Sequence, residues 1–148
     1  MSYAKFKDAL EDFYKLESNK GIHYEVAFEI IRDEWIAAGR VHDLTKAVLA
    51  NWDDGNCEDF IMPLEEKLVL DDDPDLFIAL WRGILRHRLR PLTYENTQKQ
   101  RRYVLEGILR MRKGLDSFEN RPLIDEEFIR LDKLELAVRT VKKPKYPQ

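Results

Sequence analysis

Histidine and acidic side chains are the groups in this chain whose types and spacing suggest chemistry. The chain has 148 residues, with three histidines and one cysteine. His42 is followed directly by Asp43, and His23 precedes the pair. An imidazole beside a carboxylate can bind a divalent metal ion, which lowers the pKa of a bound water and activates it for hydrolysis. His23, His42 and Asp43 are therefore candidate metal ligands, and the sequence assigns no catalytic residue outside that interpretation.

The residues around this pair resemble part of a known family. The segment VHDLTK at 41–46 is similar to the His-Asp doublet of HD-domain phosphohydrolases, which are all-α proteins. In that family a preceding His, the doublet and a later Asp bind a metal that activates water for phosphate ester hydrolysis. The resemblance implies that His23 and one of Asp53 or Asp54 would complete the site. A metal-dependent phosphohydrolase is accordingly the alternative function.

Other sequence motifs of catalysis are absent. Cys57 is the only cysteine, so it cannot form an intramolecular disulfide, and no partner in the sequence marks it as a nucleophile. The segment DDGN at 53–56 lacks the ligand spacing of a calcium loop. The chain also has no glycine-rich phosphate loop and no Gly-x-Ser-x-Gly. We therefore expect no cofactor and favour a function without catalysis.

Charge is distributed unevenly, although the net charge is only −3. Residues 53–75 include ten acidic side chains against Lys67 alone, and residues 82–113 include ten basic side chains against Glu95 and Glu106. Oppositely charged surfaces can steer a charged partner and fix its orientation. The predicted partner-binding residues are Trp52, Asp53, Asp54, Glu58, Asp59, Asp71, Asp72, Asp73 and Asp75. A secondary basic surface is predicted at Arg82, Arg86, Arg90, Arg102 and Arg110. Mutual neutralisation of the two segments within the fold remains the alternative.

The clearest element that could position these charges is a central helix within 71–91, DDDPDLFIALWRGILRHRLRP. Asp72 or Asp73 can cap its N-terminus, and Pro74 suits its first helical position. Its apolar residues recur with helical spacing over a wide face, so the helix must pack against several neighbours. Arg88 falls within the apolar sector. We expect it to extend its charge to solvent at the helix end or, alternatively, to pair with a buried carboxylate.

Helical periods account for nearly every other apolar residue, and no segment alternates with the period of two that marks a strand. Gly39 is expected just after a helix, Val26 is expected to point inward, and Thr93 is a possible N-cap. GILRHR at 83–88 recurs as GILRMR at 107–112, and chance similarity of two amphipathic helices is favoured over a true repeat. The remaining helices are predicted at 3–17, 23–38, 41–52, 58–70, about 97–113 and 126–140.

These elements predict an all-α protein of about seven helices, arranged as a bundle or a small stack of antiparallel helical hairpins. We expect one domain over 1–141 and a disordered tail over 142–148. No run approaches the length of a membrane span, and the N-terminus lacks the apolar segment of a signal peptide, so a soluble cytoplasmic protein is expected.

The favoured function is a non-catalytic module that binds another protein. Within that class we favour an immunity or antitoxin type of inhibitor, whose acidic surface would cover the basic site of a toxin or enzyme. Nucleic acid is not an expected partner, because the chain lacks a helix-turn-helix signature and a zinc knuckle. A structural helical homodimer is the second alternative.

Overall fold

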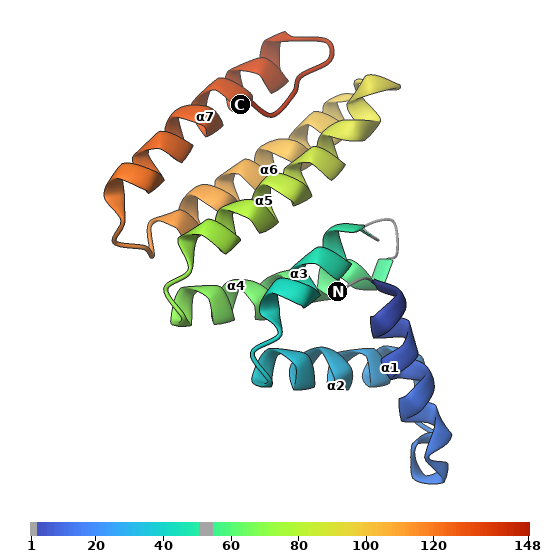
Figure 1. Ribbon diagram of the computed structural model, residues 1–148. Helices are drawn as coiled ribbons and strands as arrows, with labels where there is room; N and C mark the ends of the chain where they lie inside the picture. Colours follow the sequence, from blue (N-terminus) through green and yellow to red (C-terminus); the bar gives the residue numbers. More distant parts are fainter. Residues whose placement is uncertain (1–2, 51–54) are drawn as a thin grey trace. The chain divides into compact units, whose positions relative to one another are not determined.

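The computed structural model describes residues 3–50 and 55–148, with side chains over 7–50 and 58–148 (Figure 1). These residues form seven α-helices and three short 3-10 helices, and the described part of the chain contains no strand. The prediction of an all-α fold with about seven helices is confirmed. Contacts within the chain divide it into two compact units, 1–67 and 68–148. The expectation of a single domain stays a prediction.

Unit 1 is built from short helices, which are α1 (Tyr3–Lys15), η1 (Glu17–Asn19), α2 (Tyr24–Ala37), α3 (Val41–Ala50), η2 (Gly55–Phe60) and most of α4 (Ile61–Leu70). The first three α-helices pack against one another, and α2 also contacts η2. Phe28 and Phe60 join α2 to η2, because their ring centroids are 4.9 Å apart and both side chains are buried. Leu44 and Leu64 are fully buried. Aromatic and leucine side chains from these helices therefore form the core of the unit.

Helix α2 ends as the sequence predicts, at a glycine with a left-handed backbone. Gly39 has φ of +76°. Its N–H donates to the Ile36 carbonyl at 3.1 Å, and the Arg40 N–H donates to the Trp35 carbonyl at 2.9 Å. This pair of bonds is a Schellman motif, which satisfies carbonyls at the helix end. The inward orientation predicted for Val26 is wrong, since its side chain is 48% exposed. The buried stripe lies one helical step away, at Ala27, Phe28, Ile31 and Trp35.

Unit 2 consists of three long helices in antiparallel succession, which are α5 (Pro74–Leu89), α6 (Gln98–Leu115) and α7 (Arg121–Thr140), with η3 (Arg90–Thr93) between the first two. Helix α6 packs against both α5 and α7 (Figure 1). The central helix has the predicted start: the Asp73 carboxylate accepts a hydrogen bond from the Leu76 N–H at 3.1 Å, and Pro74 occupies the first turn. Nine of the sixteen residues of α5 are buried, as a helix with several neighbours requires.

Two glycines of α6 allow it to approach α5 closely. A methyl group on Gly107 would lie 2.8 Å from both Leu85 Cδ2 and Arg88 Nη1. A methyl group on Gly114 would overlap the ring of Phe77. A side chain at either position would therefore force the neighbouring groups apart. Gly107 belongs to the GILRMR segment that is similar to GILRHR at 83–88.

One helix start and one helix cap in unit 2 differ from their predicted positions. Helix α7 begins at Arg121 rather than at residue 126, because Asn120 caps it and Pro122 lies in the first turn. A proline is tolerated there because the N–H groups of a first turn have no partner within the helix. Helix α6 is capped by Thr97 rather than Thr93, through a hydrogen bond of 3.1 Å from a backbone N–H of the first turn.

Candidate functional site

The predicted acidic surface is divided between the two units. Glu58 and Asp59 belong to unit 1, where both are exposed. The Asp59 carbonyl accepts a hydrogen bond of 3.0 Å from Arg32 Nη1, so its backbone is held while its carboxylate faces solvent. Trp52, Asp53 and Asp54 lie outside the described residues. The remaining aspartates of the set belong to unit 2.

The turn between α4 and α5 carries the aspartates of unit 2. Its geometry repeats the end of α2, with Asp72 in place of the glycine at φ of +52°. The Asp72 and Asp73 N–H groups donate to carbonyls of the last turn of α4 at 3.1 and 2.9 Å, completing a Schellman motif. Asp73 also caps α5, so its carboxylate stabilises the start of that helix. Asp72 and Asp75 are exposed and make no ion pair among the described residues. Leu70, beside them, is 78% exposed.

The candidate metal ligands His23, His42 and Asp43 all belong to unit 1, and both histidines are exposed. His23 caps α2, because its ring Nδ1 accepts a hydrogen bond of 3.2 Å from the Glu25 N–H. His42 and Asp43 lie in the first turn of α3, where Arg40 Nε approaches the Asp43 carboxylate at 3.8 Å. Within residues 3–50 and 55–148, no three His, Cys, Asp or Glu side chains are grouped as metal ligands would be. The proposed outer ligands Asp53 and Asp54 are not part of that range.

The first arginine of the predicted basic surface is used inside unit 2. Arg82 Nε donates to Glu127 Oε1 at 2.9 Å, and Arg82 Nη2 donates to Glu127 Oε2. Arg130 Nη1 adds a bond of 3.3 Å to the same carboxylate, which has no exposed surface. Burial alone would raise the pKa of Glu127. The hydrogen bonds and the two positive charges outweigh burial, so the pKa of Glu127 lies below its ordinary value. We call Arg82, Glu127, Arg130 and Tyr146 the Glu127 cluster.

Tyr146 brings the C-terminal segment into this cluster. Its hydroxyl donates to Glu127 Oε1 at 2.5 Å, and the side chain is only 7% exposed. Burial and the adjacent carboxylate raise the pKa of Tyr146 far above its ordinary value, so the phenol remains a proton donor. Pro144 is buried as well. The segment 142–148, predicted to be disordered, therefore contributes packed side chains to unit 2.

Several other basic side chains of α5 and α6 lie over aromatic rings. The guanidinium carbon of Arg86 is 5.6 Å from the ring centroid of Tyr146, and that of Arg110 is 5.0 Å from a ring centroid of Trp81. Arg88 is 6% exposed and lies 3.9 Å from the ring centroid of Tyr103, whose carbonyl accepts its hydrogen bond at 3.1 Å. Arg88 thus remains within the fold instead of extending to solvent. Arg86 and Arg110, by contrast, remain exposed beside their rings, and cation–π contacts at exposed sites contribute only about 0.5–1 kcal/mol.

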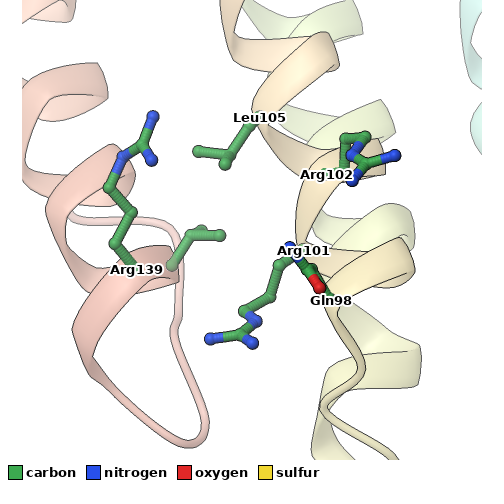
Figure 2. A pocket seen from close by; sticks show the side chains of 6 residues that line it. Gln98, Arg101, Arg102, Leu105 and Arg139 are labelled. Carbon is green, nitrogen blue, oxygen red and sulfur yellow. The ribbon is translucent and has the colours of Figure 1, made fainter.

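A groove between α6 and α7 is lined by arginines that make no ion pair among the described residues. We call it the arginine groove; it has a volume of about 380 Å³, and its lining residues are Gln98, Arg101, Arg102, Leu105, Val138 and Arg139. In Figure 2 the Arg101 side chain extends from α6 toward α7, and Arg139 projects from α7. Arg102 points away from α7. None of the three has an ion-pair partner among the described residues. Positive charge is therefore concentrated here without internal compensation.

Of the residues that line this groove, the sequence predicts only Arg102 as part of a basic surface. Gln98, Arg101, Arg102 and Leu105 follow the spacing i, i+3, i+4, i+7, which places them on one face of α6. This face of α6 could therefore have been identified from the sequence. Arg139 comes from the end of α7, and no local pattern relates it to the start of α6. Its contribution depends on the antiparallel packing of the two helices.

One hydrogen bond ties together the helix ends that border the groove. Asn96 Nδ2, just before α6, donates to the carbonyl of Lys142 at 2.7 Å, just after α7. Lys142 and Lys143 are exposed and add two positive charges at this end of unit 2. The groove is therefore fixed in place by the fold and lies in a positive environment.

The chain has no significant match to any protein-family model, curated protein or solved structure with which it was compared. No helix in the described residues combines the length and the hydrophobicity needed to cross a membrane.

Proposed function

We propose that this protein is a non-catalytic module that binds another protein through its acidic residues, with the α4–α5 turn at the centre of the interface. The observation that supports this proposal most directly is the environment of Asp72 and Asp75. Both carboxylates are exposed and make no ion pair among the described residues, and the exposed Leu70 lies beside them. Unpaired charge next to an exposed apolar side chain suits a binding surface better than a purely solvated one.

The ion pairs of unit 2 support the same proposal. Arg82 and Arg130 bind Glu127, Arg112 binds Asp132, and Arg121 lies near Asp116 and Asp125. These arginines of α5, α6 and α7 are therefore paired with acidic residues of α7 and of the loop before it. The charge of Asp72 and Asp75 consequently remains available to a partner.

The narrower form of the proposal is an immunity or antitoxin type of inhibitor that acts in the cytoplasm. Its acidic residues would cover a basic catalytic or binding site of a toxin or enzyme. Complementary charge would accelerate the encounter and exclude acidic competitors, with the strongest effect at low ionic strength. The partner is thus expected to present a basic surface with an apolar pocket for Leu70.

The test removes charge without disturbing the turn. In the double variant Asp72→Asn/Asp75→Asn both carboxylates become amides, and asparagine tolerates the left-handed conformation that residue 72 adopts. The matched control is Glu29→Gln/Glu34→Gln, which removes two exposed charges from α2. Partners are captured from native lysate with each tagged full chain, and association rates are then measured with the purified partner.

We expect the Asp72/Asp75 variant to associate about tenfold more slowly at low salt, and the difference to shrink as salt is added. The control variant should associate like the unmodified chain. Identical association rates for all three proteins would show that the α4–α5 turn does not contact the partner.

A further inference from the structure

The arginine groove lies at the other end of unit 2 from the α4–α5 turn. Helices α5 and α6 are antiparallel, so the start of α6 lies near the end of α5, and α5 has sixteen residues. A helix of that length spans about 24 Å at 1.5 Å per residue. The two features therefore cannot be parts of one small binding site. The groove is therefore a separate candidate binding site.

The unpaired charge of the groove contrasts with six other arginines of this protein. Arg32, Arg40, Arg82, Arg112, Arg121 and Arg130 each have a carboxylate partner. Arg101, Arg102 and Arg139 line one cavity and have none among the described residues. Three like charges in one groove repel each other, and a bound anion would relieve that repulsion. The groove is therefore electrostatically complementary to a ligand with negative charge.

The lining of the groove indicates what kind of anion fits. A guanidinium can donate two parallel hydrogen bonds to one carboxylate. Leu105 provides partly exposed apolar surface in the groove, while Val138 is fully buried. Gln98 provides an amide in the first turn of α6, at the positive end of the helix dipole. Carboxylates next to an aliphatic side chain are the groups that match this lining. A short acidic peptide carries both.

The neighbouring cavity argues against a nucleic acid backbone. A second cavity shares Arg102 with the groove and is also lined by Glu95, Lys99, Tyr103 and Glu106. A strand of phosphates that continued past Arg102 would meet two carboxylates there, and like charges repel. A peptide needs negative charge only at the groove itself. Its following residues could bond to the polar side chains of the second cavity.

We propose that the arginine groove binds an acidic peptide segment of a partner protein. One carboxylate of the segment binds Arg139 on the α7 side, and another binds Arg101 on the α6 side. An apolar side chain between them packs on Leu105. The Asn96–Lys142 hydrogen bond joins the ends of both helices, so the backbone around the groove is preformed and the ordering on binding falls mainly on the arginine side chains.

The experiment measures binding of a labelled peptide panel to the full chain by fluorescence anisotropy. Each peptide carries a pair of glutamates at a different spacing around a leucine, and a matching panel has glutamine in place of glutamate. A single-stranded oligonucleotide serves as the competing class of ligand. The groove variant is Arg101→Gln/Arg139→Gln. The matched control is Lys113→Gln/Lys133→Gln, which removes two exposed positive charges from the same two helices.

We expect at least one glutamate peptide to bind, its glutamine counterpart to fail, and the groove variant to lose roughly tenfold or more in affinity. The lysine control should bind like the unmodified chain. Binding that is equal in the groove variant and the control would overturn the proposal. So would a preference for the oligonucleotide, or failure of every glutamate peptide to bind the unmodified chain.

Two further measurements distinguish this proposal from binding at the acidic turn and from binding of a second copy of the chain. The Asp72→Asn/Asp75→Asn variant should bind the peptide normally, since the acidic turn lies at the other end of unit 2; the two proposals therefore fail independently. Light scattering of the unmodified chain tests whether a second copy is the occupant. A dimer that dissociates in either the Arg101/Arg139 or the Asp72/Asp75 variant would replace the partner protein with the acidic turn of another copy, and would contradict the proposal.

Discussion

Unit 2 contains two groups of arginines that differ in one respect, the presence of a carboxylate. In the Glu127 cluster, Arg82 and Arg130 surround a carboxylate with no exposed surface, and Tyr146 completes its hydrogen bonds. In the arginine groove, Arg101 and Arg139 face a cavity instead. The Glu127 cluster is built from α5, α7 and the C-terminal segment, and the arginine groove from α6 and α7, so the two groups share one helix, α7.

This difference separates charges that serve the fold from charges that can serve a ligand. A buried carboxylate must have partners, because an unpaired buried charge costs several kcal/mol. The arginines around Glu127 are therefore committed to stability. The arginines of the groove are solvated and compensate no internal charge, so they can exchange water for an external anion. Mutations in the two groups should consequently have opposite consequences for stability and binding.

The largest effect is expected from Glu127→Gln, which preserves shape and removes the charge. Arg82 would lose the carboxylate that it binds with two hydrogen bonds. Breaking a buried ion pair on one side typically costs about 3–5 kcal/mol. Urea unfolding monitored by circular dichroism measures this loss. The control is Asp132→Asn, whose carboxylate pairs with Arg112 at the surface and is 69% exposed; exposed pairs contribute about 0–1 kcal/mol. Equal stability of the two variants would contradict a structural role for Glu127.

A smaller loss is expected from Tyr146→Phe, which removes one hydroxyl. The ring would keep its packing, while Glu127 would lose a hydrogen bond donor in a buried site. Hydrogen bonds to charged groups contribute about 1.5–3 kcal/mol, so the free energy of unfolding should fall by about that amount. Tyr94→Phe is the control, because that side chain is 87% exposed. An unchanged unfolding midpoint for Tyr146→Phe would mean that the C-terminal segment adds nothing to the cluster.

The acid dependence of stability should reveal the same carboxylate. The pKa of Glu127 is lower in the folded chain than in the unfolded chain, where it is about 4.3. The stability that this group contributes is therefore complete above that unfolded value and is lost as the pH falls through the folded one. Urea unfolding of the unmodified chain and Glu127→Gln across this acidic range should show a smaller loss in the variant. Parallel curves would show that other carboxylates account for the acid dependence.

The sequence predicts the features of unit 2 that depend on neighbouring residues. Asp73 and Pro74 mark the start of α5, and the structure confirms both, because capping uses atoms only a few residues apart. Arg82 is predicted at an exposed surface, yet it binds Glu127, which lies 45 residues further along the chain. Arg88 is likewise held by Tyr103, a residue of the next helix. Local patterns carry no information about such distant partners.

The candidate sites likewise contain residues that local spacing identifies and residues that only the packing of helices brings together. Gln98, Arg101 and Arg102 could have been recognised as one polar face of α6 from their spacing alone. Arg139 could not, because its place beside Arg101 results from the packing of α7 on α6. The roles of Asp72 and Asp75 in binding, and of the groove arginines, stay predictions until a partner is measured. Charge segregation along the sequence was informative, but only the fold distinguishes paired from unpaired arginines.

The smallest effect, and one of opposite sign, is expected from Arg101→Gln/Arg139→Gln. Removing two charges from a solvated groove relieves repulsion without breaking an ion pair, so the free energy of unfolding should rise by a few tenths of a kcal/mol at low salt. Screening should abolish the gain at high salt, where the Debye length is only about 3 Å at 1 M. Lys113→Gln/Lys133→Gln controls for net charge. If the groove variant instead lost stability on the scale of Glu127→Gln, the groove arginines would belong to the fold, and the contrast between the two groups would be wrong.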